Sequence, residues 1–492
     1  MLSRRDFLKL ASLVTASAAL SSCAPVYRRL AGDLPIVPWT ALSTNDFLAL
    51  NRITFGARVE ERARFAEIGL QAYIEEQLDF ESINDLACDL QLSTFKTLNM
   101  EANKLEGISN ELFDGYDREK APNELRQATF LRQLYSKRQL YEVMVEFWSD
   151  HFNIFMDKEK EFFLKTVDDR EVIRKHALGN FRDLVWASAH SPAMMVYLDN
   201  QANEKSHPNE NYARELMELH TLGVDSGYTQ KDVMELARCL TGWNVKEHFW
   251  LGDFVFKEDI HDTGEKNVLG LSIQPSGIKE AEQVIEMLVA HPSTAKFICT
   301  KLARRFIADD PPQELIEIAA QTFLNTNGDI KSVLRVILFD GLAFAKPKYK
   351  RPVNFLLSTL RMLNAETDGI ALHEYLVRMG QLYFNWPTPD GYPDYNEAWQ
   401  GNLMPRWQFS FALIRDELKN TKHNLQSLLD VSSTGILQDD VDSITSLLLG
   451  NPLERLARNG IIDSVRTAGA TDEETLQIIA TSIIASPAFQ WR

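Results

Sequence analysis

The sequence has few cysteines and too few basic residues to balance its acids, and each shortage excludes a class of protein. Four cysteines occur in 492 residues with no C-x-x-C pair, which argues against a disulfide scaffold and a thiolate metal site. Lysine and arginine total 52 against 69 acidic residues, and the net charge of −17 argues against nucleic-acid binding. Beyond the N-terminus no apolar run reaches the roughly 18 residues of a membrane span.

Familiar catalytic and nucleotide-binding motifs are also missing. The chain has no phosphate loop and no G-x-G-x-x-G, G-x-S-x-G or H-E-x-x-H motif, so nucleotide-binding, hydrolase-elbow and zincin functions have no support. A repeat of about 20–50 residues is absent too, which disfavours a solenoid. With 45% hydrophobic and 25% charged residues, the composition is that of an ordinary globular protein.

The N-terminus has the pattern of an export signal. Arg4 and Arg5 precede a short apolar segment and resemble a twin-arginine signal, which directs folded chains to the twin-arginine export machinery. The following Leu-Ser-Ser-Cys resembles a lipobox, in which lipoprotein-processing enzymes lipidate Cys23. An ordinary secretory signal with an accidental cysteine is the alternative.

We therefore expect residues 1–22 to be a signal peptide and residues 23–45 to be a tether from a membrane-bound lipid. Ala24 after the cysteine favours the outer membrane, and the expected location is the periplasm or the cell surface. Cleavage removes three basic residues and one acidic residue, which changes the net charge from −17 to −19.

The remainder, residues 46–492, has helical periodicity nearly throughout and predicts a mainly α fold in one large irregular domain. Segments 250–257 and 268–273 are candidate strands of a small β-hairpin around the His261 loop. Cys88, Cys239 and Cys299 are expected to be buried, although one disulfide is an alternative. The predicted helix N-caps are Thr229, Ser293, Asp329 and Thr471.

Three polar segments are candidates for a chemical site. The first ends an apolar helix with Asp150, His151 and Asn153, which suit a metal, an acid–base pair or a hydrogen-bonded helix end. The second, residues 209–223, places Arg214 and Glu215 on one polar helix face.

In that second segment, an ion pair between Arg214 and Glu215 is the alternative to catalysis. His220 lies about 140° from Glu215 around a straight helix, so one metal is not expected to bind both directly. Gly223 is expected to end the helix.

The third segment is the loop of His261 and Asp262. Together with His151 and Glu215, His261 could form a mixed nitrogen and oxygen site for a divalent metal. Glu215 or Asp262 would then act as a general base. No spacing rule enforces this grouping.

A fourth segment, residues 385–407, is rich in proline and aromatic residues and is expected to form an irregular lobe. Trp386, Tyr392 and Trp399 lie among acidic residues, a combination that suits sugar binding. Packing within the protein is the alternative use of such rings, and the one we favour.

Several of these segments resemble a bacterial family called domain of unknown function 1800. The resemblance follows the expected order from about residue 45 to the C-terminus. It covers segments 51–56, 147–153, 179–184, 191–195, 209–223, 227–232, 237–243, 261–262, 291–295, 301–306, 387–392 and 486–490. Where the family pattern has tryptophan after Asp-Gly, this chain has Tyr392.

The resemblance implies an exported, largely helical protein with an exported sulfatase-like partner, and it assigns no catalytic residue. The leading hypothesis is therefore a lipid-anchored envelope protein that acts on or with an envelope polymer or such a partner. The alternatives are a metal-dependent hydrolase and a carbohydrate-binding protein that uses the aromatic residues of segment 385–407.

Overall fold

The computed structural model describes residues 26–28, 31, 39–109, 115–224, 226–246, 252–429 and 436–492. The predicted export and lipidation residues Arg4, Arg5 and Cys23, with most of the predicted tether, lie outside these described residues. No helix in the described ranges is both long and apolar enough to cross a membrane.

Helices dominate the described chain, so the predicted mainly α fold is confirmed. The first half contains α3 (Thr44–Ile53), α4 (Val59–Leu78), α5 (Leu86–Leu92), α6 (Ala102–Ser109), α7 (Lys120–Tyr135), α8 (Gln139–His151), α9 (Glu161–Asp168), α10 (Phe181–Ala189), α11 (Pro192–Tyr197), α12 (Glu210–Glu215) and α13 (Gln230–Leu240). Helices α9 and α12 continue into the π-helical turns η3 (Asp169–Arg174) and η5 (Leu216–Thr221).

The second half is equally helical. It contains α14 (Lys279–Val289), α15 (Pro292–Phe306), α16 (Gln313–Asn325), α17 (Ile330–Gly341), α18 (Pro352–Met362), α19 (Ile370–Arg378), α20 (Leu403–Ile414), α21 (Leu425–Leu429), α22 (Leu437–Leu449), α23 (Arg455–Ala468) and α24 (Asp472–Ala485). Short 3₁₀ turns η1, η2, η4, η7, η8, η9 and η10 lie at Phe80–Ser82, Lys96–Asn99, Asn200–Ala202, Glu258–Ile260, Leu342–Phe344, Asn396–Trp399 and Ala488–Gln490.

Small β-hairpins occur as predicted, but with different strand pairing. The described strands form antiparallel pairs, which are β1 (Trp243–Val245) with β2 (Phe254–Phe256), β3 (Lys266–Val268) with β4 (Leu271–Ile273), and β5 (Glu366–Thr367) with β6 (Thr421–Lys422). The two predicted strands therefore do not pair with each other. Leu269 and Gly270 have φ of 51° and 81°, and two positive φ angles in a two-residue loop close β3 directly onto β4.

Three of the four predicted N-caps are confirmed. The side chains of Thr229, Asp329 and Thr471 each accept a hydrogen bond from a backbone N–H in the first turn. The prediction for Ser293 is wrong, because α15 begins two residues earlier with His291 as its N-cap. Proline at the first helical position has the helical φ already, which favours this earlier start.

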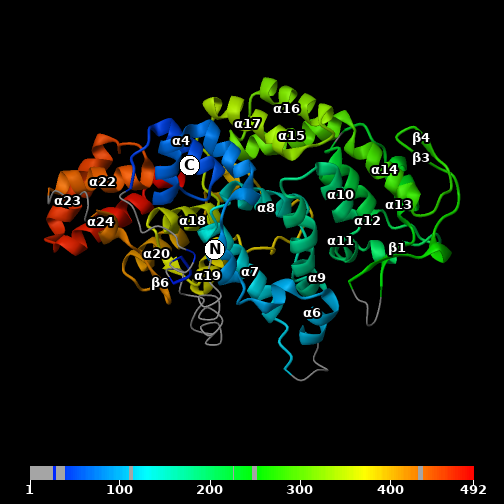
Figure 1. Ribbon diagram of the computed structural model, residues 1–492, viewed down its shortest axis with the longest axis horizontal. Helices are drawn as coiled ribbons and strands as arrows, with labels where there is room; N and C mark the ends of the chain where they lie inside the picture. Colours follow the sequence, from blue (N-terminus) through cyan, green and yellow to red (C-terminus); the bar gives the residue numbers. More distant parts are fainter. Residues whose placement is uncertain are drawn as a thin grey trace.

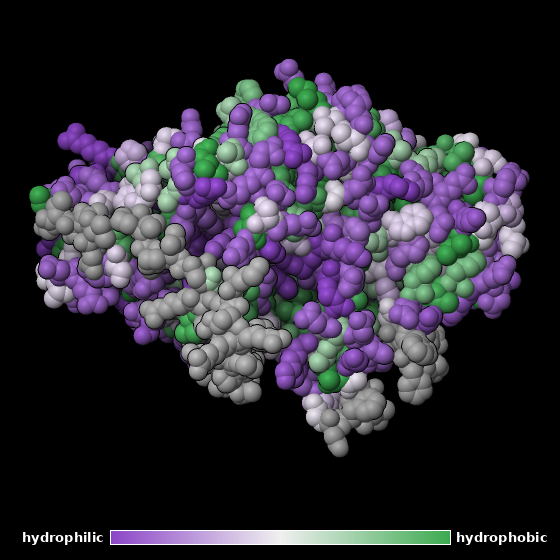
Figure 2. Space-filling model, in the orientation of Figure 1, coloured by the Kyte–Doolittle hydropathy of each residue, from purple (hydrophilic) through white to green (hydrophobic). Residues whose placement is uncertain are grey.

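The helices surround one connected set of buried apolar side chains that extends from Phe47 to Phe489. Helices α20 and α22–α24 lie at one end of the long axis, and α13, α14 and the β3–β4 hairpin lie at the other (Figure 1). Helices α15–α17 pack on one another between these ends. Polar side chains cover most of the face seen in Figure 2, with apolar ones in small groups.

The described chain contains three cysteines, Cys88, Cys239 and Cys299. All three are buried free thiols, as expected from the sequence, and no disulfide joins any of these three. Burial raises the pKa of Cys239 and Cys299 to about 12. Protonated, buried thiols are poor nucleophiles and poor metal ligands, so they act as small apolar side chains.

Candidate functional site

A cavity of about 180 Å³ lies beside the predicted Asp150–His151 cluster, and we call it the Lys301 pocket. The C-terminal end of α8 contributes Asp150 and His151, and α15 contributes Lys301 and Arg304. Arg351, the N-cap of α18, and the loop of residues 390–395 complete the wall. The pocket therefore joins the first and fourth candidate segments.

Gly391 allows the 390–395 loop to lie against the end of α8. Its φ is +72°, and a Cβ at this position would overlap the carbonyl oxygen of Asp150. Both the left-handed backbone and the close approach require glycine. This contact places the neighbouring Asp390 at the pocket.

Two of the arginines at the pocket are already neutralised by buried carboxylates. Glu146 bridges Arg305 and Arg351 through its two carboxylate oxygens. Arg351 Nη1 also donates to Asp150 Oδ2 at 2.8 Å, and Arg305 Nη1 lies 3.9 Å from Asp394 Oδ1. These pairs hold α8, α15 and α18 together and leave little positive charge for a ligand.

Lys301 and Arg304 are different, because neither has a carboxylate within 4.0 Å in the described chain. Lys301 Nζ donates to His151 Nδ1 at 2.9 Å, and burial lowers the pKa of Lys301 to about 8. Arg304 Nε donates to the carbonyl oxygen of Asp309 at 3.1 Å. Three residues apart on α15, both cations face the pocket without a direct ion pair in the described chain, and the carboxylates of Asp150, Asp390 and Asp394 act on Lys301 only from a longer distance.

The contacts of His151 determine which of its nitrogens carries the proton. Nε2 lies 3.1 Å from the carbonyl oxygen of His220, which can only accept, so Nε2 is the donor. Nδ1 is then the acceptor for Lys301. Burial, reinforced by the charge of Lys301, keeps the pKa of His151 well below its usual range, so the ring is neutral.

Asp150 is a further titratable group in the pocket. Burial raises its pKa to about 6, although Arg351 opposes that shift. Asp150 and Lys301 thus change charge on either side of neutral pH. Such perturbed groups in one cavity are typical of functional sites.

The second candidate segment lies near this pocket but does not line it. Burial, together with the charge of Glu218, raises the pKa of Glu215, and Asp390 adds to this effect. The ion pair considered between Arg214 and Glu215 is not the one observed, because Arg214 Nη2 lies 3.0 Å from Glu210 Oε2, one helical turn away.

The assumption of a straight helix through this segment is wrong. The helix widens into the π-helical turn η5 directly after Glu215, and π-helical turns are frequent at functional sites. His220 in this turn is fully buried, and neither of its ring nitrogens has a hydrogen-bond partner among the residues that the structure describes. Gly223 follows the turn with φ of 87°, in agreement with the predicted helix end.

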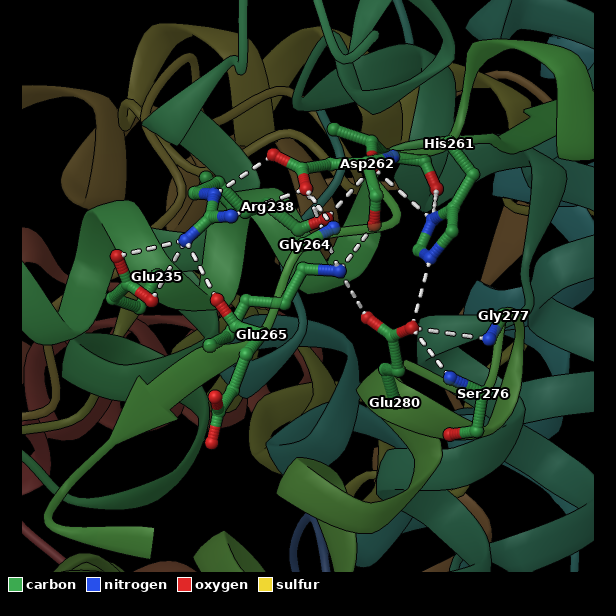
Figure 3. A network of polar contacts seen from close by, with 12 residues as sticks. Glu235, Arg238, His261, Asp262, Gly264, Glu265, Ser276, Gly277 and Glu280 are labelled. Atoms are coloured by element: carbon green, nitrogen blue, oxygen red, sulfur yellow. Dashed lines mark hydrogen bonds and ion pairs between the residues drawn. The ribbon is translucent and has the colours of Figure 1, made fainter. Parts of the chain in front are cut away.

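The third candidate segment belongs to a separate polar network (Figure 3). His261 Nδ1 lies 2.7 Å from the carbonyl oxygen of Thr241, and Nε2 lies 3.1 Å from Glu280 Oε1. The other oxygen of Glu280 forms a buried ion pair with Lys266. This network joins the loop to α13 and α14, which is a structural use of the histidine.

Asp262 is also engaged within that network. Its carboxylate receives two hydrogen bonds from Arg238, at 2.8 and 3.1 Å, and Arg238 also contacts Glu235 on α13 (Figure 3). A carboxylate held by a guanidinium in this bidentate way is a poor general base.

The predicted metal grouping of His151, Glu215 and His261 is not assembled. Both nitrogens of each histidine are occupied by protein groups, and the two rings belong to different networks. Among the described residues, no three histidine, cysteine or acidic side chains are arranged to hold a metal ion. Sequence spacing could not reveal this, because the partners Lys301 and Glu280 are distant along the chain.

The aromatic residues predicted for sugar binding mainly pack on one another. Tyr392 and Trp399 are 9% and 4% exposed and form a small cluster with Tyr349, against which the partly buried Trp386 packs. The Tyr392 hydroxyl and the Trp399 indole N–H donate to the backbone carbonyls of Leu382 and Pro393. Neither ring is free to stack on a sugar.

The basic residues of the pocket were missed as site residues in the sequence. Lys301 and Arg304 follow the ordinary pattern of an amphipathic helix, and Arg351 only precedes a helix. Their role depends on neighbours 150 or more positions away, such as His151. The only available signal was the run of basic residues at 301–305.

No curated protein and no solved structure is similar enough to this chain to be matched. A family model described as "Protein of unknown function (DUF1800)" matches residues 48–491. Because this match covers nearly all of the sequence, the chain belongs to that family.

Proposed function

We propose that the protein binds an acidic group of its ligand in the Lys301 pocket. The observation that carries this proposal is that Lys301 and Arg304 face the same cavity, and neither has a carboxylate within 4.0 Å among the described residues. A partly buried cation interacts with a ligand anion much more strongly than a cation in water does. An arginine also offers a planar set of donors that matches a carboxylate, sulfate or phosphate group.

The size of the pocket limits the ligand. A volume of about 180 Å³ is below the roughly 300–1,000 Å³ of sites that enclose a drug-sized molecule. One acidic sugar residue or a similar terminal group fits this space better than a long segment does. The exposed Tyr395 at the rim offers a face for neighbouring residues of a polymer.

We propose further that this ligand is part of an envelope polymer. The support is the N-terminal sequence pattern, which resembles a twin-arginine signal followed by a lipobox at Cys23, a combination typical of lipid-anchored envelope proteins. Mass spectrometry of the mature protein tests this assignment. An unmodified Cys23 retained in the mature chain would refute lipid anchoring.

Calorimetric titration with glucuronate, and with glucose as its neutral counterpart, tests the binding proposal. We expect glucuronate to bind and glucose not to bind. Lys301→Met and Arg304→Met should each weaken glucuronate binding about tenfold, the usual value of a charged hydrogen bond.

Lys296→Met is the matched control, because Lys296 lies on the same helix but is exposed and away from the pocket. Sulfate and phosphate in the same assay show which acidic group is preferred. If all these anions fail to bind, or if binding is unchanged in both pocket variants, the proposal is wrong.

A further inference from the structure

A second cavity, of about 580 Å³, lies between α3, the junction of α22 with α23, and residues 486–492. Its wall is largely apolar and includes Phe47, Leu48, Met362, Leu448 and Leu453. The volume falls within the roughly 300–1,000 Å³ typical of small-molecule sites. We call this cavity the Lys350 pocket.

Two basic side chains at the wall of the Lys350 pocket have no acidic partner within 4.0 Å among the described residues. Lys350 is 3% exposed, and its Nζ lies 3.3 Å from the centroid of the Phe489 ring without a carboxylate or carbonyl partner in the described chain. Arg492 also lines the cavity, and its buried Nε and Nη1 have no hydrogen-bond partner in the part of the chain that the structure describes. The one acid of the lining, Glu454, is exposed.

Burying two basic side chains without an acidic partner in the described chain lowers the stability of the protein unless a bound ligand supplies an anion. A buried basic group that contacts only an aromatic ring recovers part of the hydration that it loses, but less than an ion pair would return. An anion placed beside Lys350 and Arg492 would restore that interaction, whereas a neutral or cationic group would not. The apolar wall in turn requires a ligand with an extended hydrocarbon surface.

We propose that the Lys350 pocket binds a single-chain amphiphile with a terminal carboxylate, which is the chemistry of a fatty acid. The carboxylate contacts Lys350 and Arg492, and the chain lies against Phe47, Leu48 and Leu448. This site is separate from the Lys301 pocket in its lining residues, so neither proposal depends on the other.

Calorimetric titration of the full-length chain with dodecanoate tests the proposal. Cys23→Ser removes the predicted lipid attachment point, so that no detergent competes with the probe. We expect one dodecanoate per chain and an affinity that rises about fourfold per methylene from octanoate to dodecanoate. Dodecyltrimethylammonium, which has the same chain and a positive head, should bind at least tenfold more weakly.

Lys350→Met separates ligand binding from a structural role. Dodecanoate should bind this variant about tenfold more weakly, while dodecanol should bind as it does to the unchanged pocket. The melting temperature should not fall, because methionine occupies a similar volume and removes a buried amine that has no hydrogen-bond partner in the described chain. Lys346→Met is the control, since Lys346 is exposed and only four residues away.

Arg492→Gln provides a second variant, and it should also weaken dodecanoate binding. The proposal is overturned if dodecanoate shows no saturable binding, or if the cationic amphiphile binds equally well. Unchanged dodecanoate affinity in both Lys350→Met and Arg492→Gln would likewise overturn it.

Discussion

His220 should make the folded protein sensitive to acid. The side chain is fully buried in the π-helical turn η5, with Phe152 at a ring-centroid distance of 5.0 Å. Neither ring nitrogen has a hydrogen-bond partner in the described chain. Burial, with a contribution from Lys301, lowers the pKa of His220 from 6.5 to about 3.

The size of the effect follows from proton linkage. Below pH 6.5 the unfolded chain protonates His220, whereas the folded chain keeps it neutral down to about pH 3. The unfolded state therefore binds more protons, and the free energy of unfolding decreases as the pH falls through this window. At about 1.4 kcal/mol per pH unit, His220 alone should remove about 2 kcal/mol between pH 7 and pH 5.

Urea unfolding of the parent protein and of His220→Leu at both pH values measures this contribution. The other histidines are common to both proteins, so their contributions cancel in the difference. The stability of the variant relative to the parent should rise by about 2 kcal/mol between pH 7 and pH 5.

The same substitution of the exposed His207 serves as the control for replacing a histidine by leucine outside the core. If the difference between His220→Leu and the parent is equal at pH 7 and pH 5, the reasoning is refuted. His220 would then be as accessible to protons in the folded chain as in the unfolded one.

Three other predictions concern the polar network and the Lys301 pocket. Glu280→Gln should lower the free energy of unfolding by about 3 kcal/mol, because the buried Lys266 ammonium then keeps only the more distant Asp262 carboxylate, 3.8 Å away, as a charged partner. The double variant Glu280→Gln/Lys266→Met should have a higher free energy of unfolding in urea than Glu280→Gln alone. Equal values for the two variants would contradict the charge argument. Gly391→Ala should cost more than about 2 kcal/mol, since the residue has a positive φ and its Cβ would overlap the carbonyl oxygen of Asp150. A melting temperature equal to that of the parent would exclude this close approach. Glucuronate affinity should fall as the pH rises through about 8, because the Lys301 ammonium loses its proton there. Equal affinities at pH 7 and pH 9.5 in calorimetry would show that the charge of Lys301 is not used.

The sequence predicted best those features that depend on residues a few positions apart. Thr229 and Thr471 form capping boxes with residues three positions later, so their helix starts are visible in a short window. The end of α8 was expected at the polar cluster of Asp150, His151 and Asn153, where the apolar periodicity stops, and α8 ends at His151. The wrong cap at Ser293 shows the limit, because proline preceded it and moved the helix start.

The sequence could not show which groups the candidate histidines contact, because their partners come from other parts of the chain. His151 and His261 have similar residue types around them in sequence, yet one donates to the carbonyl of His220 and the other contacts Glu280. The π-helical turn after Glu215 also changes which side chains share a face, and a straight-helix projection cannot include it.

The sequence by itself determined the mainly α fold, three of the four helix N-caps predicted from it and the family, because hydrophobic periodicity, caps and motif order are local properties of the chain. Only the tertiary structure decided which charges are neutralised. Glu146 neutralises arginines 159 and 205 positions away, while Lys301 and Arg304 have no carboxylate within 4.0 Å among the described residues. Charge compensation depends on distance in space and on burial, and folding alone sets both.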